Sequence, residues 1–231
     1  MILKKDKIFR KLIKKEDGFI SRHLNRKISI PISLFIVRHN IPISANFMSF
    51  IAFICGMVGG VFFTLGESIL GGVFVQIHSV LDGCDGELAR IRGKSKFGEF
   101  IDKVFDRIAE VFIFFGIGYY QFLLSNSLSI LLFTFGVVFY NLLRHYAYEI
   151  FIVIDKSTYK KISISKTKDS WIDRIYKRVR KLRLHQRDMS LFLIFIASFF
   201  NQQFKILILM FLVLLVNDVF FFFVFLRSKK E

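Results

Sequence analysis

The sequence contains little cysteine and little proline, and these shortages exclude several classes of protein. Its 231 residues include 2 Cys and 2 Pro, and no CxxC pair occurs. Two cysteines in apolar sequence cannot form the disulfide framework of a small secreted protein. With 14 Gly and 2 Pro, the chain is neither collagen-like nor a proline-rich low-complexity segment. No repeat is visible at periods of about 20 to 50 residues, which argues against solenoid and propeller folds.

Acidic residues are also scarce, with 18 Asp+Glu against 34 Lys+Arg and a formal net charge of +16. Such a basic excess is typical of proteins that bind nucleic acid or the anionic face of a membrane. The sequence is nevertheless 54% hydrophobic, with a mean hydropathy of +0.50, so disorder is excluded. Residues 1–27 contain ten Lys or Arg and no apolar core, so we do not expect a cleavable signal peptide.

Four apolar stretches approach or exceed the roughly 20 helical residues that cross a bilayer, and two more follow them in the sequence. They are residues 44–65, 68–88, 97–124, 128–154, 189–200 and 204–226. The fifth is the shortest and can span only with little tilt or from within a polar cavity. Before them, residues 28–38 mix Ile and Phe with basic flanks, which predicts a helix lying along the membrane surface. We therefore predict an all-α integral membrane protein with six transmembrane helices preceded by an N-terminal interfacial amphipathic helix.

The distribution of Lys and Arg predicts the orientation of these helices. The basic residues gather before the first stretch, in the connections after the second and fourth, and at the C-terminal end. The positive-inside rule then places both termini in the cytoplasm, in a multi-pass protein of the cell membrane. We expect a basic N-terminus with a juxtamembrane helix, a six-helix membrane domain containing a basic cytoplasmic connection, and a short cytoplasmic tail. Their boundaries are 1–43, 44–226 with the connection at 155–187, and 227–231.

Four aspartates stand in or beside the second and third apolar stretches, where an ionisable residue costs about 2.5–3.5 kcal/mol on insertion scales. Residues 82–90 read DGCDGELAR and residues 98–106 read GEFIDKVFD. On helices, Asp82 and Asp85 share one face, while Asp102 and Asp106 are stacked four residues apart. A short connection makes the two helices neighbours, so these faces are expected to meet.

Four carboxylates that face one another need cations, and oxygen ligands suit Mg²⁺, Mn²⁺ or Ca²⁺ rather than zinc. A pair of such ions is typical of phosphoryl-transfer sites. Glycines in both segments would allow close approach of a substrate or of the helices. The alternative is that the aspartates only anchor helix ends, paired with Arg90, Arg92, Lys103 and Arg107. The regular spacing of four aspartates with two glycines argues against it.

These two segments resemble the signature of the CDP-alcohol phosphotransferase (phosphatidyltransferase) family, which reads DxxDGxxAR, a spacer, then GxxxDxxxD. The spacer after Arg90 has seven residues here, where relatives often have eight. The resemblance implies a six-helix membrane fold, a homodimer, and a polar cavity open to the cytoplasm. It also implies a two-ion site for Mg²⁺ or Mn²⁺ and a CDP-alcohol donor.

Carried over residue by residue, the resemblance assigns a role to each position of the motif. Metal would be held by Asp82, Asp85, Asp102 and Asp106. Asp106 would also act as the general base. The CDP moiety would be bordered by Gly86, Ala89, Arg90 and Gly98, and the guanidinium of Arg90 matches pyrophosphate oxygens physically as well.

Residues 17–29 (DGFISRHLNRKIS) and 187–192 (RDMSLF) resemble the branch that makes inositol phosphates, including di-myo-inositol-phosphate phosphate synthases and phosphatidylinositol-phosphate synthases. A phosphorylated acceptor needs cationic ligands, for which Arg144 and Arg187 are the candidates. Alternatively, Arg187 is only a cytoplasmic flank of the fifth stretch. Arg144 could instead form a structural bridge with Glu110 or Asp218.

We therefore predict an enzyme that transfers a substituted phosphate from CDP-inositol or CDP-diacylglycerol to a polar alcohol, releasing CMP. An inositol phosphate is the favoured acceptor, and glycerol phosphate or serine are the alternatives. A membrane transporter is a further alternative, but it predicts charges spread over several helices near the midplane. A nucleic-acid-binding domain is not expected, because the basic residues flank apolar spans.

Overall fold

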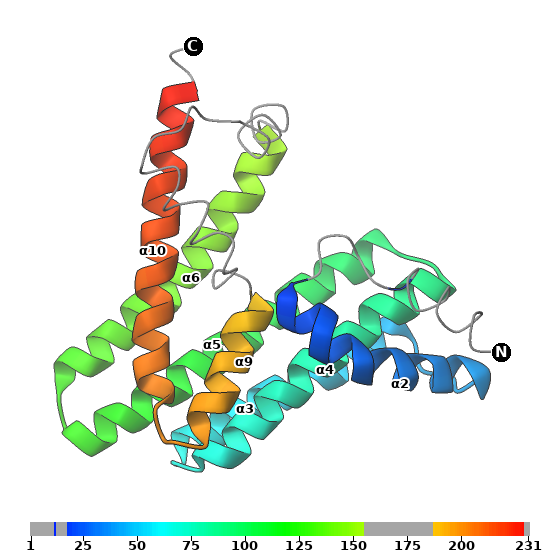
Figure 1. The fold of residues 1–231 in the computed structure, drawn as a ribbon, viewed down its shortest axis with the longest axis horizontal. Coiled ribbons are helices and arrows are strands. Elements are labelled where there is room, and N and C mark those ends of the chain that lie inside the picture. The colour runs from blue at the N-terminus through cyan, green and yellow to red at the C-terminus, as the bar shows by residue number, and fades with distance from the viewer. Residues whose placement is uncertain (1–11, 13–17, 155–186, 229–231) are drawn as a thin grey trace.

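The computed structural model describes residue 12 and residues 18–154 and 187–228, and this part of the chain is helical without β-strands. The basic connection, apart from Arg187, and most of the basic N-terminus lie outside the described residues. The helices are η1 (Ser21–Asn25), α2 (Arg26–Arg38), α3 (Ala45–Thr64), α4 (Ser68–Arg92), α5 (Lys96–Ser125), α6 (Leu128–Ile154), α9 (Arg187–Ser198) and α10 (Gln203–Ser228). Figure 1 shows α6 and α10 rising away from the group formed by α3, α4 and α5.

The helix boundaries follow the six predicted stretches closely, and polar residues set several of them. Ser44 accepts a hydrogen bond from the Phe47 amide at 3.1 Å and caps α3. Ser95 caps α5 in the same way, through the Gly98 amide at 2.9 Å. Such caps satisfy amides that would otherwise lack a partner at a helix start. Asn126, with φ of 49°, ends α5 in the left-handed conformation that asparagine tolerates.

Helix α3 packs against both α4 and α5, and these two make few close backbone contacts with each other. Glycines on α3 permit this approach. A Cβ added at Gly59 would lie 3.1 Å from the Gly71 carbonyl oxygen of α4. A Cβ added at Gly60 would lie 2.5 Å from the Phe112 carbonyl oxygen of α5. Small residues let helix backbones come close in membrane proteins, and here α3 brings the two aspartate-bearing helices together.

A larger side chain at Gly60 is expected to destabilise the fold. In Gly60→Val the new methyl groups meet the α5 backbone, which cannot move aside like a flexible side chain, so we expect a loss of about 1–3 kcal/mol. Thermal unfolding in detergent measures this change. Gly136→Val on α6 is the matched control, because nothing lies within 4 Å of a Cβ added there. Equal unfolding temperatures for the two variants would contradict the packing described.

The main apolar core joins the helices at the end of the bundle away from the aspartates. It is formed by Phe63, Val75, Ile113, Phe114, Ile117, Val137, Leu191, Ile194, Leu207 and Met210. The core therefore holds α3, α4 and α5 together at one end, and the aspartates lie toward the other.

Within the described residues, three helices are long and apolar enough to cross a membrane by length and composition: α3, α5 and α6 as far as Ala147. The charged motif lies in the C-terminal half of α4, and α9 has only 12 residues. The all-helical class is thus confirmed, and the count of six spans stays a prediction.

Candidate active site

Three aspartates from α4 and α5 meet in one cluster. Asp82 of α4 and Asp102 and Asp106 of α5 each offer a carboxylate oxygen, and these oxygens lie within 4.8 Å of one another. The side chains are partly buried, so water screens their mutual repulsion only in part. Three hard oxygen donors within this range fit a shared Mg²⁺ or Mn²⁺ ion.

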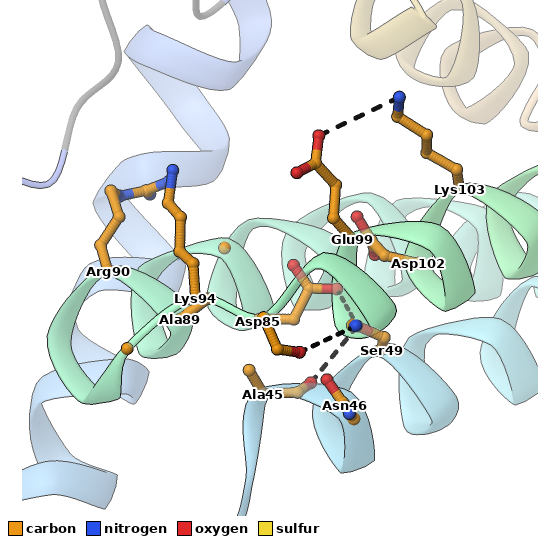
Figure 2. Close-up of a pocket in the computed structure, with 14 residues that line it drawn as sticks. Ala45, Asn46, Ser49, Asp85, Ala89, Arg90, Lys94, Glu99, Asp102 and Lys103 are labelled. Carbon is orange, nitrogen blue, oxygen red and sulfur yellow. Dashed lines mark hydrogen bonds and ion pairs between the residues drawn. The ribbon is translucent and has the colours of Figure 1, made fainter.

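The fourth predicted ligand, Asp85, lies beside this cluster but outside the set of three. It is buried, and its Oδ2 accepts a hydrogen bond from Ser49 Oγ of α3 at 2.7 Å. Its carboxyl group is also within hydrogen-bonding reach of Asp102. Figure 2 shows Asp85 and Asp102 next to Ser49. Helix α3 therefore orients one of the four aspartates, which the spacing within the motif could not indicate.

The cation within the cluster is Arg187, the first residue of α9. Its guanidinium donates to Asp82 Oδ1 at 3.1 Å and to Asp106 Oδ1 at 2.7 Å. Its Nη2 also lies 2.9 Å from His78 Nε2. Arg187 thus reaches into the site rather than only flanking a helix. The helix-end alternative fails for two of its proposed partners, because Arg107 pairs with Glu110 and Arg92 donates to the carbonyls of residues 41 and 43.

Glu110 is a site residue that was not predicted from the sequence. It is 3% exposed, and its carboxylate accepts 2.8 Å hydrogen bonds from Arg187 Nε, Arg107 Nη1 and Asn141 Nδ2. Its position four residues after Asp106 continues the stripe of α5 that carries the aspartates. This spacing was a signal that could have revealed it. Glu110 accepts from Nε of Arg187, whereas Asp82 and Asp106 accept from its two terminal nitrogens, so Glu110 helps to orient the guanidinium toward the aspartates.

A cleft of about 270 Å³ opens next to the aspartates, between α3, α4 and α5. Its lining includes all four positions predicted to border the CDP moiety, namely Gly86, Ala89, Arg90 and Gly98. Asp85 and Asp102 form part of the same wall (Figure 2). A Cβ added at Gly98 would lie 2.5 Å from Asn46 Oδ1, so only glycine fits there without displacing that amide. Asn46, Ser49 and Lys94 also line the cleft.

A second, smaller cavity of about 40 Å³ lies on the other side of Arg187, between α5, α6, α9 and α10. Its polar lining residues are Glu110, Asn141, Arg144, His145, Arg187 and Ser190. Arg144 lines it while its Nε donates to Asp218 at 2.8 Å. This is one of the two structural bridges considered for Arg144. Both candidate acceptor arginines therefore border one cavity, and Arg187 also touches the aspartates.

Comparison with known proteins connects this site to one family. The model of the CDP-alcohol phosphatidyltransferase family matches residues 42–216. The chain is 30% identical over 185 residues to the bifunctional IPC transferase and DIPP synthase of Aquifex aeolicus, covering 79% of this chain and 38% of that protein. It is 38% identical over 79 residues to the archaetidylinositol phosphate synthase of Pyrococcus horikoshii, covering 34% of this chain and 42% of that protein.

The chain spans less than half the length of these curated relatives. A solved structure that it resembles is Mycobacterium tuberculosis phosphatidylinositol phosphate synthase with CDP-DAG bound, at 17% identity and a TM-score of 0.46. That match covers 78% of this chain and 94% of the other. The family model covers both aspartate-bearing helices and most of the described chain, and the chain belongs to the CDP-alcohol phosphatidyltransferase family.

Proposed function

We propose that the protein transfers a substituted phosphate group from a CDP-alcohol to the hydroxyl of a polar alcohol and releases CMP. The observation that carries this proposal is the position of the aspartate cluster at the edge of a cleft lined by the four predicted CDP-binding residues. Membership of the family supports it. An inositol phosphate is the favoured acceptor, because a relative is named as an archaetidylinositol phosphate synthase.

In this proposal, Asp82, Asp85, Asp102 and Asp106 hold two Mg²⁺ or Mn²⁺ ions. The close set of Asp82, Asp102 and Asp106 supports one ion, and the contact between Asp85 and Asp102 supports a neighbouring one. When bound, the ions polarise the pyrophosphate and neutralise charge that develops in the transition state.

The cleft residues hold the donor. Gly86, Ala89 and Gly98 have little or no side chain, so the nucleotide can lie close to the helix backbones. Arg90 lines the same cleft, where its planar guanidinium can donate two hydrogen bonds to phosphate oxygens. Together they place the β-phosphorus of the donor toward the aspartates.

Asp106 acts as the general base. It accepts the proton of the acceptor hydroxyl as that oxygen forms a bond to the β-phosphorus. The bond between the β-phosphorus and the oxygen bridging to the α-phosphate breaks, and CMP leaves with that oxygen. Asp106 suits this role because it belongs to the aspartate cluster and its carboxylate is oriented by a 2.7 Å hydrogen bond from Arg187.

Arg187 and Arg144 bind the phosphate of the acceptor from the second cavity, which both of them line. We expect Arg187→Lys to raise the acceptor KM at least about tenfold, because lysine cannot reproduce a forked contact. Arg144→Lys is the companion variant and is expected to have a smaller effect, because Arg187 contacts Asp82 and Asp106 whereas the Nε of Arg144 donates to Asp218, outside the aspartate cluster. Initial rates of CMP release at varied acceptor concentration measure both. An unchanged acceptor KM in both variants would contradict the assignment.

The same proposal places the chain in the lipid bilayer as a homodimer. Six membrane spans occupy residues 44–226, preceded by the juxtamembrane helix within 1–43 and followed by the tail 227–231, with both termini in the cytoplasm. The agreement of the six helix boundaries with the apolar stretches supports this arrangement. In it, the cleft opens on the cytoplasmic side, next to the basic connections.

A CMP-release assay on the purified protein tests the function. CDP-inositol and CDP-diacylglycerol are each combined with inositol phosphate, glycerol phosphate, inositol and serine, with Mg²⁺ or Mn²⁺ present. We expect release with inositol phosphate. A water-soluble phosphodiester product identifies the soluble donor, whereas a chloroform-extractable product identifies the lipid donor. Absence of CMP from every combination would contradict the proposal.

A further inference from the structure

A buried ion pair joins α2 to α4 on the side away from the cleft. The Glu87 carboxylate of α4 is fully buried, and Arg26 of α2 is 4% exposed. Arg26 Nη1 donates to Glu87 Oε1 at 2.8 Å. Ser29 Oγ donates to the same oxygen at 2.6 Å, and Ser33 Oγ donates to Oε2 at 2.7 Å. Both oxygens of one α4 side chain are thus held by residues of α2.

The contact extends to the backbone of α4, one turn earlier. Arg26 Nη1 also donates to the Gly83 carbonyl oxygen at 2.7 Å. A Cβ added at Gly83 would lie 3.1 Å from both Arg26 Nη1 and Ser29 Oγ, so this glycine leaves room for the guanidinium. Gly83 and Glu87 therefore form one face of α4 to which α2 is attached at two successive turns.

The aspartate side chains project from α4 on the side nearly opposite the face formed by Gly83 and Glu87. At 100° per residue, the centre of the face formed by Gly83 and Glu87 is about 150° from the centre of the face formed by Asp82 and Asp85. Helix α4 is thus held by α2 from one side and presents two aspartates to α5 from the other. Any rotation of α4 about its axis changes both contacts together.

The size of this coupling follows from helix geometry. Side-chain ends lie about 5–6 Å from a helix axis, so a rotation of about 10° displaces a carboxylate by roughly 1 Å. A misplacement of about 1 Å can reduce catalysis about 100-fold. By contrast, replacing a buried ion pair with well-packed apolar residues is often neutral for stability or stabilising. The pair is therefore better suited to fixing the direction of α4 than to stabilising the fold.

We infer that Arg26 and Glu87 are positioning residues for the transfer, an inference that rests on the proposed function. They set the rotation of α4 and so place Asp82 and Asp85 relative to the aspartates of α5. Neither residue lines the cleft. Helix α2 precedes residue 42, where the match to the family model begins. The helix that holds α4 through Arg26 therefore lies outside the matched region.

The test compares Arg26→Met/Glu87→Leu with the unmodified full chain in detergent. An apolar cluster of Ile36, Met48, Cys84 and Leu88 already joins α2, α3 and α4, so the double variant should still fold. We expect its unfolding temperature to change by less than about 4 °C. Its Mn²⁺ dissociation constant, measured by electron paramagnetic resonance, should rise about 10–100-fold, as when groups that orient metal ligands are lost. The kcat for CMP release should fall at least about tenfold, with a donor KM that changes less.

Ser68→Ala/Gln203→Leu is the matched control. It removes a buried 2.8 Å hydrogen bond between α10 and the other end of α4. In this control variant, the free energy of unfolding is expected to fall without a change in Mn²⁺ affinity. A folded double variant that binds Mn²⁺ and turns over within about twofold of the unmodified chain would overturn the inference.

Glu87→Gln tests the positioning role if the double variant does not fold. The amide keeps the shape of the side chain and an acceptor for the serine hydroxyls, but it removes the charge that attracts Arg26. Weakened Mn²⁺ binding in this variant supports the inference, and unchanged Mn²⁺ binding with unchanged turnover overturns it. If the unmodified chain neither binds Mn²⁺ nor releases CMP, the proposed function fails instead.

Discussion

Asp106→Asn is expected to lower the rate of CMP release at least about 100-fold, because an amide cannot accept the proton of the acceptor hydroxyl. Asparagine keeps the size of the side chain and one oxygen for the contact with Arg187, which lies 2.7 Å from Asp106 Oδ1. Donor binding should be largely preserved, because Asp106 does not line the cleft proposed to hold the donor. Turnover is measured by CMP release, and binding is measured by titration with whichever CDP-alcohol the unmodified protein uses.

Glu110→Asp is the companion to this variant. Glu110 lies one turn further along α5 and contacts Arg187 without belonging to the set of three clustered aspartates. A shortened side chain there is expected to lower turnover less than Asp106→Asn, because the proton acceptor remains. Turnover near the unmodified level in Asp106→Asn would contradict the assignment of the base.

Asp102→Asn is expected to abolish measurable binding of Mn²⁺ at the concentration that saturates the unmodified chain. Asp102 belongs to the set of three oxygen donors and also contacts Asp85, so its charge serves both proposed ions. Removing one negative ligand from a hard-cation site weakens both the attraction and the coordination. Electron paramagnetic resonance of free Mn²⁺ measures the loss directly, and CMP release should fall in parallel.

Glu99→Gln controls for a general loss of negative charge. Glu99 is three residues from Asp102 on α5, but its side chain is 70% exposed. Its Oε1 lies 4.0 Å from Lys103 Nζ. Exposed pairs of this kind contribute at most about 1 kcal/mol. Mn²⁺ binding in Glu99→Gln should match that of the unmodified chain. Equal losses in the two variants would show that the ion responds only to overall charge.

The helix boundaries and the aspartate motif could be predicted from the sequence because both depend on local patterns. Apolar runs of sufficient length end at serine, glycine and asparagine, and these residues cap helices for reasons that involve only their neighbours. The four aspartates and two glycines repeat at helical spacing, so their faces follow from 100° per residue.

The partners of the charged groups could not be predicted, because they depend on helices that are distant in the chain. Arg187 meets Asp82 across 105 residues and Asp106 across 81. Its position at the edge of an apolar stretch is equally compatible with a simple cytoplasmic flank. Arg144 likewise had two possible partners, and the structure selects Asp218. Such choices are made by how helices pack, which periodicity in one segment does not contain.

By itself, the sequence determined the chemistry available to this protein: four carboxylates, small residues beside them, and a segregation of basic from apolar residues. The tertiary structure decided how that chemistry is arranged. Glycines of α3 let two aspartate-bearing helices approach, Ser49 orients Asp85, and α2 holds α4 through Glu87. The physical reason is that a helix face is defined by local geometry, whereas its rotation and its partners are set by close packing between segments far apart in the chain.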